Sequence, residues 1–214
     1  MTDARPPGAA PVTVWVRRLT GAYLDRRAAG DAMLTAMADG AGFPGVRVTR
    51  DQDGRPLLRG AGDGVHVSIS HHHEYVATAI TLCGPVGVDV EVVRDLPAQA
   101  LADRWFAGHE ARHLAGLAEP ERSAEFLRLW TVKEAVGKAL GVGLRGGGMR
   151  RPVGPLGPWT PDGPFALAPL PEVDGVAVAG YREGDLLVAV ACRAGDAAGT
   201  PVSIRRDGAP DGRG

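Results

Sequence analysis

The sequence predicts an α+β fold made of two similar halves. The stretches YVATAITLC, ending at Cys83, and LLVAVAC, ending at Cys192, share a strand pattern and indicate a short internal repeat. With 214 residues, of which 44% are hydrophobic, the chain can build one large core or two halves that share one. We therefore expect an N-terminal half at residues 1–95, a C-terminal half at 96–193 and a mobile tail at 194–214.

The N-terminal half is expected to contain one helix and a pair of strand segments. Residues 22–38 have the spacing of an amphipathic helix. Residues 66–82 carry β-branched alternation on both sides of a histidine run, and residues 87–93 alternate strictly. Gly84-Pro85 between them is a turn signal, so we expect these strands to form a hairpin.

Helices dominate the first part of the C-terminal half. Residues 97–118 are expected to be helical, with a break at Gly108. Residues 123–140 give the clearest helix of the chain, because apolar residues recur along them at helical spacing. Ser123 is the expected cap at its start, and Gly141 marks its end.

The remainder of the chain predicts a loop, a second hairpin and the tail. Residues 145–164 are rich in Gly and Pro and predict a loop. The stretches 176–181 and 186–192 predict two strands of a hairpin. The sequence after Ala194 has little apolar content, so we expect a mobile tail with room for one strand at 202–204.

The bulk composition argues against several classes of partner and site. The net charge of -1 gives no basic excess for nucleic acid. No apolar run reaches the ~18–20 residues that span a bilayer, and the start lacks the apolar core of a signal peptide, so we expect no membrane association and a cytoplasmic location. Cys83 and Cys192 lie far apart and outside any CxxC pair, which argues against a disulfide framework or a structural zinc site.

Asp89 and Glu91 form the first candidate constellation. They lie two apart on a predicted strand, so both side chains leave the same face, ~6.6 Å apart along the backbone. A hard cation would offset the repulsion between them, and Mg²⁺ typically takes one or two carboxylates plus substrate phosphates. The alternative is a solvated edge strand with two exposed acids. The pair by itself favours that alternative over a cation site.

Glu134 and Lys138 form the second. They lie four apart on the predicted helix, which is typical of a surface Glu–Lys pair worth a few tenths of a kcal/mol. However, Lys133 and Lys138 are the only lysines among 24 basic residues. A solvated pair would accept arginine, whereas a site that needs a compact ammonium would not, so the pattern favours a functional role.

Three adjacent histidines follow Ser70 at the end of a predicted strand. They cannot all ligate one metal, because alternate strand residues point to opposite faces. One histidine aimed at a ligand phosphate, with the others facing solvent, fits the pattern better. Arg26, Arg27 and Arg55 are further candidates for anionic ligand contacts, each a weak signal by itself.

Taken together, these segments resemble the surfactin-type 4'-phosphopantetheinyl transferases. The matching segments are Ser70-His71 at a strand end, GVDVE at 87–91 and WTVKEAVGKALGVGL at 130–144, in the order and spacing of that family. Gly54-Arg55-Pro56 is similar to an upstream Gly-Lys-Pro of the family. The resemblance covers roughly residues 22–192 and implies two similar α+β halves with the active site in the cleft between them.

The resemblance also implies an enzymatic activity. The protein would transfer the 4'-phosphopantetheine group from coenzyme A to a serine of an apo acyl or peptidyl carrier protein, release adenosine 3',5'-bisphosphate, and act as a monomer. Such carriers serve fatty acid, polyketide or nonribosomal peptide biosynthesis, and the sequence does not distinguish them.

The roles implied by the resemblance fall on named residues. Asp89, Glu91 and Glu134 would bind Mg²⁺, and Glu134 would accept the proton of the carrier serine. Lys138, Ser70 and His71 would lie at the phosphates of coenzyme A. Arg55 and, less specifically, Arg27 would hold its 3'-phosphate.

Two other functions share the same residues. A metal-dependent phosphohydrolase of a nucleotide pyrophosphate would need the acidic residues but no protein acceptor. A non-catalytic coenzyme A-binding protein would need neither the full acidic set nor the lysine, and the intact set of Asp89, Glu91, Glu134 and Lys138 argues against it.

Overall fold

The computed structural model describes residues 11–20, 25–143, 145, 147–163 and 165–206. It confirms the α+β class. Its helices are α1 (Arg26–Gly40), α2 (Ala98–Trp105), α3 (Gly108–Ala115) and α4 (Glu121–Ala139), with a short 3-10 turn η1 (Gly148–Arg150). Among these described residues, no helix combines the length and apolarity needed to cross a lipid bilayer.

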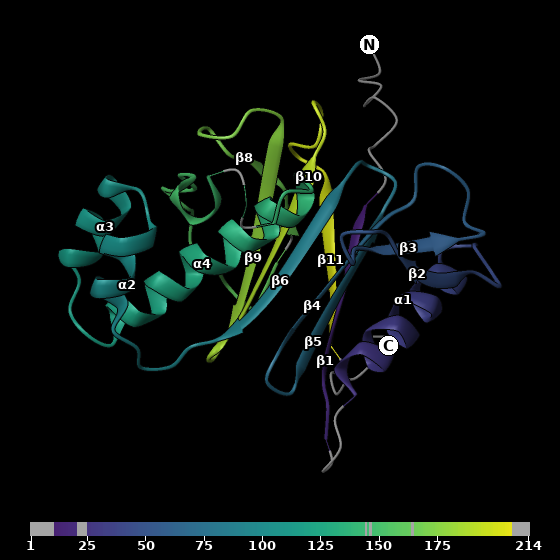
Figure 1. Ribbon diagram of the computed structural model, residues 1–214, viewed down its shortest axis with the longest axis horizontal. Coiled ribbons are helices and arrows are strands. Elements are labelled where there is room, and N and C mark those ends of the chain that lie inside the picture. Colours follow the sequence, from purple (N-terminus) through teal and green to yellow (C-terminus); the bar gives the residue numbers. More distant parts are fainter. Residues whose placement is uncertain (1–10, 21–24, 144, 146, 164, 207–214) are drawn as a thin grey trace.

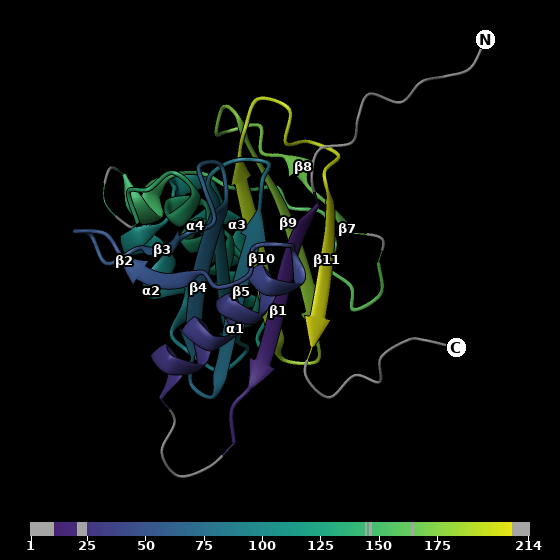
Figure 2. The same cartoon turned by 90° about the vertical axis from the view of Figure 1, so that its right-hand side faces the viewer.

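The first sheet has the strand order β4-β5-β1-β11-β7. Its strands are β1 (Val12–Arg18), β4 (His66–His72), β5 (Tyr75–Thr81), β7 (Phe165–Ala166) and β11 (Pro201–Arg206). The strands β4, β5 and β1 are antiparallel neighbours, whereas β11 runs parallel to β1. Figure 2 shows β11 lying along β1, so the last described segment of the chain completes a sheet that the first segment began.

The second sheet is antiparallel and has the order β6-β10-β9-β8. Its strands are β6 (Val86–Val92), β8 (Ala168–Pro169), β9 (Val176–Glu183) and β10 (Leu186–Arg193). A small separate hairpin joins β2 (Arg47–Arg50) to β3 (Pro56–Arg59).

The two sheets pack face to face, with helices on their outer sides (Figure 1). A core of β-branched residues from β1 meets the apolar side of β6 and β10, including Val14, Val88 and Val190, each at most 2% exposed. Helix α1 covers the first sheet with Leu34 and its neighbours, and α4 covers the second. The layer order is therefore helix, sheet, sheet, helix, and the strands β4 and β6 meet where the two sheets adjoin.

Most predicted elements are confirmed. Asp25 caps α1 by accepting a hydrogen bond from the Ala28 amide at 2.9 Å, and residues 22–24 of the predicted helix lie outside the described residues. The break at Gly108 and the second hairpin, β9–β10, are as predicted. The expected capping role of Ser123 is wrong, because α4 already begins at Glu121 and the Ser123 hydroxyl donates to the Leu96 carbonyl at 3.3 Å.

The predicted hairpin around Gly84-Pro85 is also wrong. The segment 66–82 is itself a hairpin, β4–β5, whose turn includes His73 at a φ of 49°. The backbone after β5 crosses to the other sheet, where the Arg193 amide donates to the Pro85 carbonyl at 2.8 Å and β6 pairs with β10. The turn at Gly84-Pro85 was therefore predicted correctly, but the strand that follows it, β6, pairs with the distant strand β10 and not with β5.

The predicted division of the chain needs two corrections. The sheets separate between β5 and β6, so the boundary expected at residue 95 falls after the first strand of the second sheet. The tail predicted at 194–214 is not mobile throughout, because residues 201–206 form β11 beside β1. The strand expected at 202–204 is confirmed within β11, which pairs with β1, and residues 207–214 lie outside the described chain.

Gly87 fixes how closely α4 approaches β6. A Cβ atom at this position would lie 2.0 Å from the Ala135 carbonyl oxygen and 2.8 Å from Cβ of Lys138. Only a residue without a side chain allows this contact, since real Cβ atoms do not approach backbone oxygen so closely. The glycine therefore sets the position of Lys138 over the strand that carries Asp89 and Glu91.

We predict that Gly87→Ala lowers the free energy of unfolding by about 1–3 kcal/mol, because the added methyl group must push α4 away from the sheet. The matched control is Gly40→Ala, where the new methyl meets nothing within 4 Å. Urea denaturation of both variants measures the difference. Equal stability of Gly87→Ala and the wild type would show that the helix can move away at no cost.

Candidate functional site

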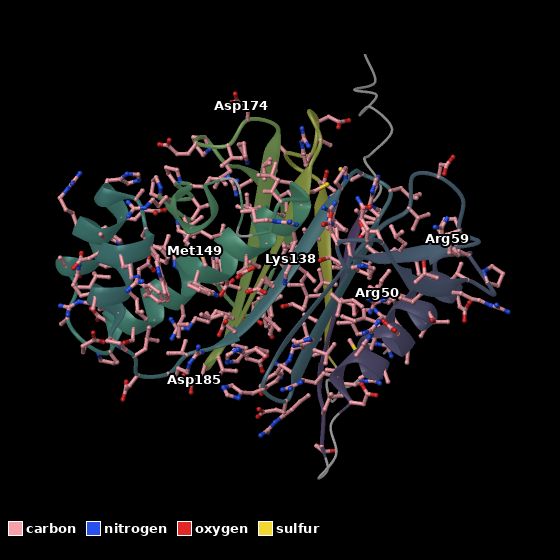
Figure 3. All side chains as sticks on the ribbon, in the orientation of Figure 1. Arg50, Arg59, Lys138, Met149, Asp174 and Asp185 are labelled. Atoms are coloured by element: carbon pink, nitrogen blue, oxygen red, sulfur yellow. The ribbon has the colours of Figure 1, made fainter. Side chains whose placement is uncertain are left out.

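One carboxylate oxygen joins β4, β6 and α4. Oδ1 of Asp89, on β6, accepts a hydrogen bond from the Ser70 hydroxyl of β4 at 2.6 Å. The same oxygen accepts one from Nζ of Lys138 on α4 at 2.8 Å, and Nζ also donates to the Val88 carbonyl at 2.8 Å. Asp89 is only 6% exposed. Figure 3 labels Lys138 near the middle of the molecule, where α4 passes β6. The prediction that Lys138 forms more than a surface pair with Glu134 agrees with this placement.

The other oxygen of Asp89 has no partner. Oδ2 is buried and accepts no hydrogen bond from the described residues. Glu134, one turn before Lys138, likewise has no hydrogen bond or ion pair within the described chain. Burial, followed by the nearby charge of Asp89, raises the pKa of Glu134 to about 7, although Lys138 acts in the opposite direction. The carboxyl groups of Asp89 and Glu134 therefore influence each other electrostatically, and each has oxygen without a hydrogen-bond partner among the described residues.

Glu91 is different, because its carboxylate is already paired. Its Oε2 accepts a hydrogen bond from Nη1 of Arg94 at 2.8 Å and lies 3.1 Å from Nδ1 of His72. Burial raises the pKa of Glu91, Asp89 adds to that increase, and Arg94 opposes it. As predicted, Asp89 and Glu91 leave the same face of β6, while Val88 and Val90 enter the core. The interpretation as two solvent-exposed acids is wrong, since both residues are less than 9% exposed.

The alternation of β4 decides which histidine meets these acids. Ser68 accepts a hydrogen bond from the Val88 amide at 3.0 Å, Ser70 donates to Asp89, and His72 contacts Glu91. His71 points to the other side of the strand and is exposed, so its contact with a phosphate stays a prediction. Burial and the neighbouring Arg94 lower the pKa of His72 to about 4, which keeps its ring neutral at neutral pH.

A cavity of about 250 Å³ lies next to Lys138. It is lined by the β2–β3 turn, by β4 and by the end of α4 with the residues that follow it. Arg55, Lys138 and Arg145 contribute basic groups to its lining. The Arg55 guanidinium donates to Asp53 at 2.6 Å and lies over Gly141, where a Cβ would be 2.9 Å from Nη1. The structure therefore brings Arg55 and Lys138 to one basic cavity beside the acidic residues.

Arg27 does not join this group. It is exposed at the start of α1 and is not part of the lining of that cavity. Its neighbour Arg26 instead donates to the His73 carbonyl at 2.9 Å, which ties α1 to the β4–β5 turn. The predicted role of Arg27 toward a ligand stays a prediction.

Lys133, the other lysine, has a role that the sequence did not reveal. Its side chain is fully buried, and Nζ donates to Glu110 at 2.6 Å and to the Arg151 carbonyl at 2.6 Å. The second Glu110 oxygen accepts from the Val153 amide at 2.9 Å. This ion pair joins α3, α4 and the loop after η1. The rarity of lysine in the sequence drew attention to both Lys133 and Lys138. It could not distinguish a lysine buried in a structural ion pair from one that lies beside the acidic residues.

The acidic residues fit a divalent cation only as part of its coordination. Within the described residues, no three His, Cys, Asp or Glu side chains gather into a ready metal cage. The buried, unpaired Oδ2 of Asp89 and the unpaired carboxyl group of Glu134 are nevertheless hard oxygen donors. Mg²⁺ usually takes one or two carboxylates and completes its octahedron with waters and substrate phosphates, so the donor set suits that ion.

The raised pKa of Glu134 gives a test that does not require activity. The folded protein holds the proton of Glu134 more tightly than the unfolded chain, in which the pKa has its ordinary value of 4.5. The free energy of unfolding therefore falls as the pH rises from about 4.5 toward about 7. Glu134→Gln removes that loss. In EDTA at pH 8 we predict a melting temperature a few degrees above that of the wild type, since about 1 kcal/mol corresponds to roughly 2–4 °C at this size.

The gain of Glu134→Gln should shrink as the pH falls toward 5, where the wild-type carboxyl is protonated. Added Mg²⁺ should raise the melting temperature of the wild type and not that of the variant. A control at a paired, remote carboxylate, Glu74→Gln, should show neither effect. A variant that melts below the wild type at pH 8 would contradict the proposed repulsion among these carboxylates.

Comparison with known proteins identifies the segment that carries this geometry. Residues 85–153 match the family model of the 4'-phosphopantetheinyl transferase superfamily. The 4'-phosphopantetheinyl transferase gsp of Aneurinibacillus migulanus is 35% identical over 80 residues, which are 37% of this chain and 33% of that protein. The 4'-phosphopantetheinyl transferase HetI of a Nostoc species is 31% identical over 102 residues, 46% of this chain and 43% of HetI.

A third relative is the 4'-phosphopantetheinyl transferase Sfp of Bacillus subtilis, with 29% identity over 99 residues, 46% of this chain and 43% of Sfp. The matched part of the chain thus spans less than half the length of each of these relatives. The resemblance inferred from the motifs is nevertheless confirmed, because residues 85–153 match the 4'-phosphopantetheinyl transferase superfamily model.

Proposed function

We propose that this protein transfers the 4'-phosphopantetheine group from coenzyme A to a serine of an apo carrier protein, with Mg²⁺, and releases adenosine 3',5'-bisphosphate. The observation that supports it best is the position of the unpaired oxygens of Asp89 and Glu134 beside Lys138, next to a basic cavity that contains Arg55. The relatives that share this segment are named 4'-phosphopantetheinyl transferases.

The proposed site lies in a cleft between two similar halves. Each half has a first strand, a helix, and an antiparallel hairpin whose second strand pairs with the first strand. In the first half these are β1, α1 and β4–β5, and in the second β6, α4 and β9–β10. The similar order supports a pseudo-twofold arrangement with the site where β4, β6 and α4 meet.

Asp89 and Glu134, with Glu91, would hold Mg²⁺. When bound, the ion would neutralise the pyrophosphate of coenzyme A, because transfer of this kind depends on positioning and charge neutralisation more than on covalent help from the protein. Lys138 would add a second positive charge at the phosphates from its place on Asp89. Arg55 would hold the 3'-phosphate from the far side of the cavity.

Glu134 would accept the proton of the carrier serine. Its raised pKa makes this carboxylate a stronger base near neutral pH than an ordinary glutamate, which suits a general base. The serine oxygen then bonds to the β-phosphorus of coenzyme A, the bond from that phosphorus to the bridging oxygen breaks, and adenosine 3',5'-bisphosphate leaves with the electron pair.

The direct test is incubation with coenzyme A, MgCl₂ and a panel of apo carriers from fatty acid, polyketide and nonribosomal peptide synthesis. We expect at least one carrier to gain the mass of one phosphopantetheine arm, and Asp89→Asn to abolish the gain. Release of phosphopantetheine without any carrier would instead indicate a phosphohydrolase. Binding of coenzyme A without any product would indicate a non-catalytic binding protein.

Lys138 tests whether a compact ammonium is needed. Its Nζ makes two contacts of 2.8 Å, to Asp89 and the Val88 carbonyl, and the wider fork of arginine cannot occupy that place. We predict that Lys138→Arg lowers kcat/KM at least about tenfold, equivalent to ~1.4 kcal/mol of barrier. Arg59→Lys, on exposed β3, is the control. Wild-type kinetics in Lys138→Arg would remove Lys138 from the reaction.

Arg55 tests the proposed 3'-phosphate contact. A charge-assisted hydrogen bond contributes ~1.5–3 kcal/mol, so Arg55→Ala should weaken coenzyme A by roughly 10- to 100-fold. The affinity for 3'-dephospho-coenzyme A should change much less. Calorimetric titration of both ligands, with a melting curve to confirm folding, measures the difference. Equal losses for the two ligands would exclude this role.

A further inference from the structure

The turn between β2 and β3 carries two aspartates with different roles. Oδ1 of Asp51 accepts hydrogen bonds from the backbone amides of Asp53 and Arg55, each at 2.9 Å, so this carboxylate holds the turn together. The Asp53 carboxylate takes no part in the turn. Within the part of the chain that the structure describes, its side-chain partners are two arginines, Arg55 and Arg145.

Each oxygen of the Asp53 carboxylate is bound by a different guanidinium group. Nη2 of Arg55 donates to Oδ2 at 2.6 Å, and Nη2 of Arg145 donates to Oδ1 at 3.3 Å. Arg55 lies at the β2–β3 turn, whereas Arg145 lies in the segment after α4. All three residues line the cavity beside Lys138. Asp53 therefore bridges, inside that lining, two of the basic groups that the cavity offers to an anion.

The contacts of Asp53 lie at the surface of the protein. The side chains of Asp53, Arg55 and Arg145 are 33%, 45% and 76% exposed. Ion pairs this exposed contribute little to stability, because water screens the charges and both side chains lose conformational freedom. The two arginines can therefore exchange the Asp53 carboxylate for another anion at low cost.

A phosphate monoester is a stronger competitor for these arginines than a carboxylate. It carries about −1.5 to −2 charges at neutral pH and three acceptor oxygens, compared with one charge and two oxygens for a carboxylate. Guanidinium groups bind both kinds of anion through the same N–H donors. Asp53 and a ligand phosphate would therefore compete for one set of donors, and only a group of higher charge would displace Asp53 readily.

We propose that Asp53 competes with the 3'-phosphate of coenzyme A for Arg55 and Arg145, and that this competition sets how tightly that phosphate binds. The inference rests on the proposed function, in which Arg55 holds the 3'-phosphate. It adds Arg145 as a second contact of that phosphate. It also gives Asp53 the role of an internal competing anion, which a ligand without the 3'-phosphate leaves in place.

The test uses adenosine 3',5'-bisphosphate and AMP as probes, titrated calorimetrically into the full chain in EDTA, so that neither a cation nor group transfer contributes. We expect Asp53→Asn to bind the bisphosphate about two- to fivefold more tightly than the wild type, because the competing charge of an exposed ion pair is removed. The affinity for AMP, which lacks the 3'-phosphate, should change much less. Arg145→Ala should weaken the bisphosphate more than AMP.

The matched control is Glu74→Gln. Glu74 pairs with an arginine, Arg18, at 3.2 Å, its side chain is 33% exposed as is that of Asp53, and it does not line the cavity. This variant should leave both affinities unchanged. In an Arg55→Ala background the gain from Asp53→Asn should shrink, because the carboxylate then competes only at Arg145. Melting curves establish that each variant is folded.

Two results would overturn the role of Asp53 while leaving the proposed function intact. One is a bisphosphate affinity in Asp53→Asn no higher than in a wild type that itself prefers the bisphosphate to AMP. The other is an equal gain for both probes, which would mean that Asp53 acts only through the net charge of the cavity. If the wild type does not prefer the bisphosphate to AMP, the 3'-phosphate contact of the proposed function is wrong, and the role of Asp53 fails with it.

Discussion

The Oδ1 atom of Asp89 is the point at which the two sheets and the long helix are joined. It accepts hydrogen bonds from Ser70 on the first sheet and from Lys138 on α4, while Asp89 itself lies on the second sheet. Removing one partner from such a buried pair typically destabilises by 3–5 kcal/mol, because the remaining charge has no compensation. Gly87 makes the contact possible, since any side chain there would hold α4 away from β6.

This arrangement leaves the site with charge that the protein does not neutralise by itself. One oxygen of Asp89 is satisfied twice and the other is buried without a partner. Burial, followed by the charge of Asp89, raises the pKa of Glu134, whereas Glu91 is paired with Arg94. A divalent cation with phosphate ligands would remove the imbalance, which is how a stable scaffold can keep a binding site that is unfavourable in the empty protein.

Sequence patterns predicted the parts of this site that depend on local geometry. Period-two alternation placed Asp89 and Glu91 on one face of β6 and its valines in the core, and helical spacing placed Glu134 and Lys138 on one side of α4. The scarcity of lysine pointed to Lys138. The motifs also carried a family resemblance that the matched segment confirms.

Apart from the expected cap at Ser123, which lies inside α4, the errors concern pairing between distant segments. The turn at Gly84-Pro85 was recognised, but nothing local indicates that β6 joins β10 rather than β5. The strand expected at 202–204 is present within β11, but its parallel pairing with β1, which joins opposite ends of the chain, has no local signal. His72 meets Glu91 only because β4 lies beside β6, so no pattern within the histidine run could single it out. The burial of Lys133 was missed for a similar reason, because its ion-pair partner Glu110 lies on another helix.

The central claim is that Asp89 and Glu134 complete their unpaired oxygens with a cation that is shared with the phosphates of coenzyme A. A crystal structure of the full chain with coenzyme A and Mn²⁺ tests it most directly, because anomalous scattering locates the ion. The account predicts a peak within coordinating distance of Oδ2 of Asp89, a carboxylate oxygen of Glu134 and the pyrophosphate, with Lys138 and Arg55 on the phosphates. An ion elsewhere, or coenzyme A bound away from the cavity between Arg55 and Lys138, would contradict it.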